Sequence, residues 1–136
     1  MRKLLLTIPA AMLLAAPALS EEKIELTEKQ QTMLDKRLEG RTAGEAQSCI
    51  NGHDQRNMTV ISDDILIFGS SRNARTIYVN KPYAGCKNAD RSILVYSRPG
   101  SSLCKGDIVQ LVDSQSRIAM GSCAFGEFVP YIKDAD

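Results

Sequence analysis

Four cysteines constrain this chain of 136 residues more than any other feature. They are Cys49, Cys86, Cys104 and Cys123, separated by 37, 18 and 19 residues. None of these spacings is the Cys-x-x-Cys pattern of zinc knuckles or thioredoxin-type redox pairs. An even number of cysteines in an oxidising compartment instead predicts two structural disulfides. Three pairings of the four residues are compatible with the sequence.

The N-terminus has the three parts of a secretory signal peptide. Arg2 and Lys3 form a basic start, residues 4–19 are an apolar run, and residues 18–20 place small side chains at a cleavage site. The apolar run is shorter than the about 20 residues of a transmembrane helix, and prolines interrupt it. The sequence therefore predicts a signal peptide over residues 1–20, a periplasmic or secreted protein, and no membrane span after cleavage.

The charge of the mature chain argues against nucleic acid as a partner. After removal of residues 1–20, 15 basic and 16 acidic residues remain. Nucleic-acid-binding domains carry a basic stripe that displaces counterions from phosphates, and the mature chain has no Lys/Arg run longer than Lys36-Arg37. A chain of this size buries a modest fraction of its surface, so disulfides would add needed stability.

Residues 21–40 form a predicted N-terminal helical segment. Thr27 is the expected N-cap, Gln30 its capping-box partner, and Gly40 the expected stop, which gives a helix over residues 28–39. Because the apolar side of this helix is narrow, we expect it to lie on a larger surface. Its members are Met33, Leu34 and Leu38.

Residues 41–136 are predicted to form a disulfide-braced β-domain. Short β-rich runs alternate with turn residues at spacings of about ten residues. Six to seven such strands predict a mainly β fold, a small antiparallel barrel or sandwich, with the one N-terminal helix and two disulfides. The apolar centre of residues 107–113 predicts a strand that is buried on both faces. The predicted strands are residues 58–61, 65–69, 76–79, 93–97, 107–113, 117–123 and 128–132.

Residues that could carry chemistry are few. His53 is the single histidine, and the neighbouring Asp54 is a carboxylate that could orient its imidazole for general-base work. Adjacent side chains seldom face each other, and no nucleophile elbow, phosphate-binding loop or EF-hand loop occurs. The sequence therefore predicts no catalytic residue, no metal and no cofactor.

Two arginines and two tyrosines are the predicted partner-binding residues. Arg72 and Arg75 stand in an expected hairpin tip, where their forked guanidiniums could grip a carboxylate or a phosphate. Tyr83 and Tyr131 each follow a proline, which is typical of contact loops in interfaces. The partner, a protein or a small molecule, and the oligomeric state stay open.

Short motifs follow one another in a particular order along residues 28–132. They are Gly40-Arg41-Thr42-Ala43-Gly44, Cys49-Ile50, Ile61-Ser62-Asp63, Ile77-Tyr78-Val79-Asn80, Ser102-Leu103-Cys104, Asp107-Ile108-Val109, Val112-Asp113 and Gly126-Glu127-Phe128-Val129-Pro130-Tyr131. In this order they resemble a family of small exported bacterial proteins without an assigned activity. The resemblance implies a signal-bearing, single-domain protein and provides no catalytic residue to transfer.

The same resemblance bears on the disulfides. The family pattern centres on the cysteines that match Cys49 and Cys104, whereas Cys86 and Cys123 look like an addition in this chain. The resemblance therefore favours the bridges Cys49–Cys104 and Cys86–Cys123.

Three functions are compatible with these observations. The first is an exported, non-enzymatic β-domain that acts as a binding or accessory module. The second is an inhibitor of an extracellular or periplasmic hydrolase, since small rigid disulfide domains present preorganised loops. The third is a small hydrolytic enzyme that uses His53.

Overall fold

The computed structural model describes residues 23–97 and 100–135, so the predicted signal peptide at residues 1–20 lies outside the described residues. The elements follow the chain in this order: α1 (Glu28–Leu38), β1 (Arg41–Ala43), β2 (Cys49–Ile50), β3 (Asn57–Ser62), β4 (Ile65–Gly69), β5 (Thr76–Asn80), the 3-10 turn η1 (Ala89–Arg91), β6 (Ser92–Val95), β7 (Leu103–Cys104), β8 (Ile108–Asp113), β9 (Ala119–Ala124) and β10 (Phe128–Lys133). The predicted mainly β fold with one N-terminal helix and two disulfides is confirmed for this part of the chain.

The helix α1 begins at the predicted residue, Glu28, and ends at Leu38, one residue before the predicted end. The Thr27 hydroxyl accepts a hydrogen bond from the backbone N–H of Gln30 at 3.3 Å, and the Gln30 side chain accepts one from the Thr27 N–H at 2.9 Å. Gly40 follows with a φ of +65°, which suits glycine best. Leu34 and Leu38 pack against the sheet beneath the helix. The capping residues therefore set the length of α1, and the leucines attach it.

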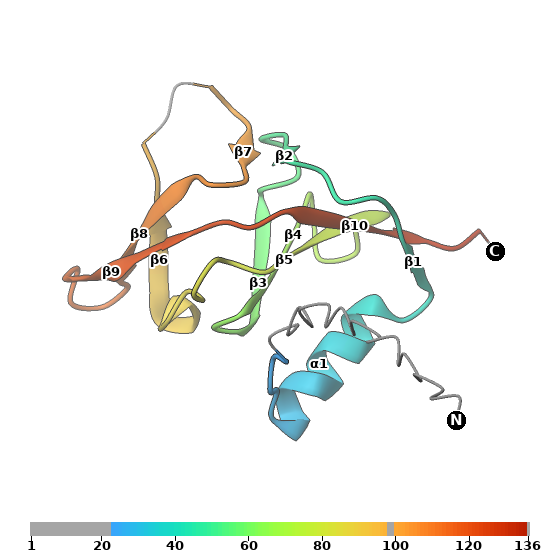
Figure 1. Cartoon of the computed structure of the whole chain (residues 1–136), viewed down its shortest axis with the longest axis horizontal. Coiled ribbons are helices and arrows are strands. Elements are labelled where there is room, and N and C mark those ends of the chain that lie inside the picture. Colours follow the sequence, from blue (N-terminus) through green and yellow to red (C-terminus); the bar gives the residue numbers. More distant parts are fainter. Residues whose placement is uncertain (1–22, 98–99, 136) are drawn as a thin grey trace, which may run out of the picture.

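The largest sheet has five antiparallel strands in the order β1-β10-β5-β4-β3 (Figure 1). Every residue of β4 is buried. Leu66 and Phe68 point into one apolar cluster, and Ile65 and Ile67 into another on the opposite face. The helix covers the second cluster, so the sheet is the central layer of the fold.

The remaining strands form two smaller sheets rather than one closed barrel or a sandwich. β6, β8 and β9 form a three-stranded sheet, and β2 pairs with β7 alone (Figure 1). The prediction of a single barrel or sandwich of six to seven strands is therefore wrong in its finer part. β6 pairs with β8 of the β8–β9 hairpin, and β10 lies between β1 and β5 in the large sheet. Pairings between segments that are distant in the sequence leave no local signal, so the sequence could not show how the strands are divided among sheets.

The strand over residues 107–113 is not buried on both faces, contrary to the prediction. β8 begins at Ile108, and it buries Val109 and Leu111 while Ile108 is 70% exposed. Among the described residues no layer covers the outer face of the three-stranded sheet, where Ile93 and Val95 are also exposed. The strand that is buried on both faces is β4.

The four cysteines form two bridges, Cys49–Cys104 and Cys86–Cys123, which is the pairing that the family resemblance favours. Cys49 and Cys104 are direct partners across β2 and β7. Cys86 and Cys123 are buried in the larger apolar cluster, which also contains Phe68, Phe125 and Phe128. The ring of Phe68 meets the other two rings edge to face. Both bridges are consistent with an oxidising compartment.

Candidate functional site

A hollow of about 420 Å³ lies between the end of β5, the start of β10 and the loops beside them. Tyr83 and Tyr131 both line it, although they are far apart in the sequence. We name this feature the tyrosine hollow. Its lining residues are Val79, Lys81, Tyr83, Lys105, Gly126, Glu127, Val129 and Tyr131.

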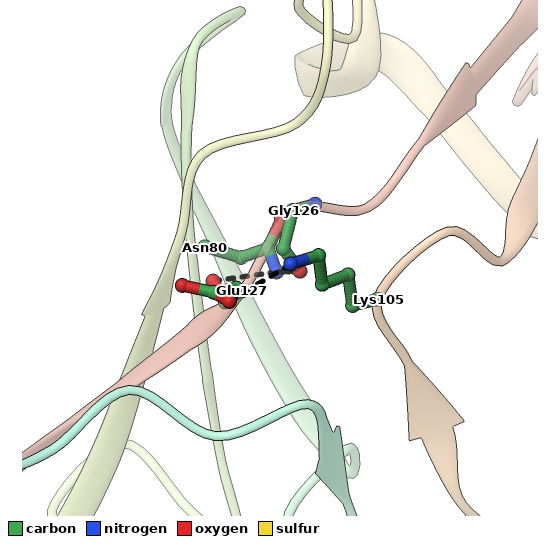
Figure 2. Close-up of polar contacts among 4 residues, drawn as sticks. All are labelled: Asn80, Lys105, Gly126 and Glu127. Atoms are coloured by element: carbon green, nitrogen blue, oxygen red, sulfur yellow. Dashed lines mark hydrogen bonds and ion pairs between the residues drawn. The ribbon is translucent and has the colours of Figure 1, made fainter.

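Asn80 holds the backbone of Gly126 and Glu127, two residues that line the tyrosine hollow. Its side chain is fully buried, and its amide nitrogen donates to the carbonyl oxygens of Gly126 at 2.8 Å and Glu127 at 3.2 Å. In return the Gly126 N–H donates to the Asn80 amide oxygen at 3.1 Å (Figure 2). A Cβ on Gly126 would clash with the carbonyl oxygen of Lys81, so this close approach requires glycine. The backbone before β10 is therefore held in one position.

An ion pair crosses the rim of the tyrosine hollow. The Lys105 ammonium lies 2.8 Å from a Glu127 carboxylate oxygen, and the two side chains come from different segments (Figure 2). The hydrogen bond to Glu127, the charge of its carboxylate and, to a lesser extent, the nearby Tyr83 raise the pKa of Lys105. Asn80 holds the backbone carbonyl of Glu127, so the backbone from which this carboxylate extends is fixed.

Tyr83 stands on a loop that the fold anchors firmly. Its N–H donates to the carbonyl oxygen of Ala124 at 2.9 Å, and the Cys86 N–H donates to the carbonyl oxygen of Asp63 at 2.7 Å. The Cys86–Cys123 disulfide ties the same loop to β9. Nevertheless the Tyr83 side chain is 52% exposed. An aromatic side chain is thus presented to solvent from a braced backbone.

Arg72 and Arg75 lie elsewhere, in the hairpin between β4 and β5, and neither lines the tyrosine hollow. Both are exposed. The backbone of this hairpin is held by other cations, since Arg37 donates to the Arg72 carbonyl oxygen and Arg41 to the Arg75 carbonyl oxygen. The structure therefore brings the two predicted tyrosines together and places the two predicted arginines at a separate surface.

Asp54 is engaged with residues other than His53. Its carboxylate accepts from the Asn51 amide at 2.9 Å and from the Tyr78 hydroxyl at 3.4 Å. Burial first, and then the charge of Asp54, raises the pKa of Tyr78. His53 is exposed in the turn after β2. These contacts use Asp54 to hold a turn against β5.

Sequence reasoning did not find Lys105 and Glu127, which line the tyrosine hollow, or Asn80, which holds the backbone beside it. Their neighbours in the sequence contain no motif, and only the docking of β10 beside β5 assembles them. Among residues 23–97 and 100–135, no group of three or more His, Cys, Asp or Glu side chains is placed to hold a metal ion. Within the same ranges, no helix has the length and apolar character needed to cross a bilayer.

Comparison with known proteins adds no relative. No family model matches the chain, and no curated protein or solved structure is significantly similar to it.

Proposed function

We propose that the protein is an exported, non-enzymatic binding module whose ligand-contact surface is the tyrosine hollow. The observation that carries this proposal is that Tyr83 and Tyr131, from distant segments, line one hollow above a fixed hydrogen-bond network. Tyrosine offers a large contact area with few rotatable bonds, so it binds at low entropic cost. A prearranged aromatic surface of this kind is typical of binding hot spots.

Export is supported by the leader pattern at residues 1–20 and by the two disulfides. The resemblance to small exported bacterial proteins agrees with this part of the proposal. The signal peptide would be removed, and the mature chain would act in the periplasm or outside the cell.

The chemistry of the tyrosine hollow indicates the kind of ligand. Val79 and Val129 add apolar side chains to the lining that contains the two tyrosines. Lys105 is neutralised by Glu127, whereas Lys81 has no ion-pair partner among the described residues. We therefore expect a segment of a partner protein that inserts an apolar or aromatic side chain and places a carboxylate near Lys81.

Tyr83→Ala is expected to weaken partner binding by at least tenfold, because truncation of a central aromatic contact costs about 2 kcal/mol or more. The immobilised mature protein is used to capture partners from the exported proteins of its source cells. The dissociation constant of the captured partner is then measured by calorimetry for both forms.

Tyr96→Ala is the matched control, since Tyr96 is 41% exposed and lies just after β6, outside the tyrosine hollow. It is expected to bind like the unaltered protein. If both variants bind the partner as tightly as the unaltered protein does, the tyrosine hollow is not the ligand-contact surface.

A second candidate function is inhibition of a hydrolase. It is favoured by the exposed Tyr83 side chain on a loop braced by Cys86–Cys123, because preorganised loops of this kind block active sites at low entropic cost. Addition of the protein at one equivalent to a captured hydrolase distinguishes the two functions. If the unaltered protein abolishes the hydrolase activity and the Tyr83→Ala variant does not, the protein is an inhibitor. Unchanged activity with both forms indicates an accessory module.

His53→Ala separates both binding functions from an enzyme. We expect this exposed residue to be replaceable with a change in stability within about 0.5 kcal/mol and unchanged partner binding. The measurements are urea unfolding and the calorimetric titration described for Tyr83. A turnover that the unaltered protein performs and His53→Ala abolishes would identify the protein as an enzyme instead.

A further inference from the structure

A second hollow, of about 330 Å³, lies where α1 meets β3 and the β4–β5 hairpin. We name it the arginine hollow. Three of its side chains are cationic and two more, Thr59 and Asn73, can donate hydrogen bonds. Its lining residues are Met33, Lys36, Arg37, Thr59, Arg72 and Asn73.

The backbone around the arginine hollow is fixed by cations from two elements, α1 and β1. Arg37 on α1 donates to the Arg72 carbonyl oxygen at 2.5 Å. Arg41 on β1 donates to the Ala74 carbonyl oxygen at 2.8 Å and to that of Arg75 at 2.7 Å. The hairpin is therefore held against α1 through its carbonyl groups, which leaves the Arg72 side chain itself outside this network.

Within the described part of the chain, nothing neutralises the positive charge of the arginine hollow. No described carboxylate lines it, and none forms an ion pair with Lys36, Arg37 or Arg72. Burial of the Arg37 guanidinium lowers its pKa, and repulsion from Arg41 and Arg72 lowers it further. Like charges gathered in this way destabilise the folded chain, and a bound anion would relieve the repulsion.

We propose that the arginine hollow binds a phosphate group. Guanidinium forks bind the oxygen atoms of phosphate in pairs, and the ammonium of Lys36 adds a third positive charge. The hydroxyl of Thr59 and the amide of Asn73 are further donors beside these cations. The site shares no lining residue with the tyrosine hollow, so its test is independent of the proposed partner binding.

Titration with inorganic phosphate tests the proposal directly. At constant ionic strength, balanced with chloride, phosphate is expected to raise the melting temperature of the mature protein, because it binds only the folded chain. Nuclear magnetic resonance shifts of the backbone amides of residues 70–75 give the dissociation constant.

The informative variant is Arg72→Gln, since Arg37 bonds to the backbone oxygen of Arg72 and this contact survives the substitution. We expect it to weaken phosphate binding about tenfold, and the double variant Lys36→Gln/Arg72→Gln to abolish the shifts. Lys87→Gln is the control, an exposed lysine outside the arginine hollow, with expected binding equal to that of the unaltered protein. If chloride acts like phosphate, or if the double variant still responds to phosphate, the proposal is overturned.

A second arm finds the source of the phosphate group. Vesicles of phosphatidylglycerol and of phosphatidylcholine are sedimented with each form of the protein. If the unaltered protein binds the anionic vesicles and the double variant does not, the phosphate group belongs to a lipid headgroup. If soluble phosphate saturates the site and no vesicles are bound, the ligand is a soluble phosphate compound. Binding of neither source by the unaltered protein refutes the proposal.

Discussion

Cys86→Ala/Cys123→Ala is expected to lose about 4 to 5 kcal/mol of unfolding free energy. These residues are 37 apart in the sequence, and a bridge over such a loop stabilises by about 4 kcal/mol through the entropy of the unfolded chain. Both sulfur atoms also lie in the apolar core, so their removal costs packing contacts. Because small domains are stable by only about 5 to 15 kcal/mol, this variant is expected to be near its unfolding threshold.

Urea unfolding followed by circular dichroism measures this loss, and we expect the midpoint to fall by about 2 M. Cys49→Ala/Cys104→Ala is the matched control, because its loop is longer, with a separation of 55, while Cys49 is exposed. The control should lose about 4 kcal/mol without the packing contribution. A larger loss in the control than in Cys86→Ala/Cys123→Ala would show that the buried bridge does not stabilise the core as described.

Asn80→Ala is expected to lose about 3 kcal/mol and to impair the tyrosine hollow. The substitution leaves the N–H and the carbonyl group of Gly126 without their partner in a buried position. Each buried polar group that loses its hydrogen bond costs about 1 to 3 kcal/mol. The Glu127 carbonyl loses its bond as well, so Glu127 is released from its place opposite Lys105. Calorimetric titration should then show that partner binding is weakened by more than the unfolded fraction of the variant, known from urea unfolding, accounts for.

Asn57→Ala is the control for the same change of side chain. Asn57 is half-buried at the start of β3, and no described residue forms a hydrogen bond with its side chain. It should lose well under 1 kcal/mol. Similar losses in the two variants would contradict the role given to Asn80.

The sequence predicted most regular elements because their signals are local. Thr27 and Gln30 mark the start of α1 through a capping box, and Gly40 marks its end. Seven predicted strands correspond to β3, β4, β5, β6, β8, β9 and β10. Their alternating or β-branched residues are visible in a window of a few residues.

The three short strands were missed for a physical reason. β1, β2 and β7 have three residues or two, too few to show a period, and each exists only because a distant strand supplies its hydrogen bonds. A different limit applies to β8, which was predicted as a strand but whose apolar residues predicted burial on both faces. Its composition does not reveal that one face of its sheet would stay uncovered.

The candidate site was predictable only in part. Proline beside Tyr83 and Tyr131 marked both as contact residues, and the structure places them in one hollow. Arg72 was singled out in the hairpin, but its neighbour Arg37 comes from a helix of ordinary amphipathic appearance. Proximity between distant segments is a property of the fold, so residues that act only together leave no signature in the sequence.

The place of β10 in the large sheet has a consequence for the order of events in folding. Among the described strands β1 pairs with β10 alone, and β10 arrives after every other strand in the chain. The neighbours β3, β4 and β5 can associate early because short connections join them. The tyrosine hollow needs side chains from both β5 and β10, so it comes into existence only when the last strand docks. A partner that recognises this surface would therefore bind the fully folded protein and would not bind chains that are still folding.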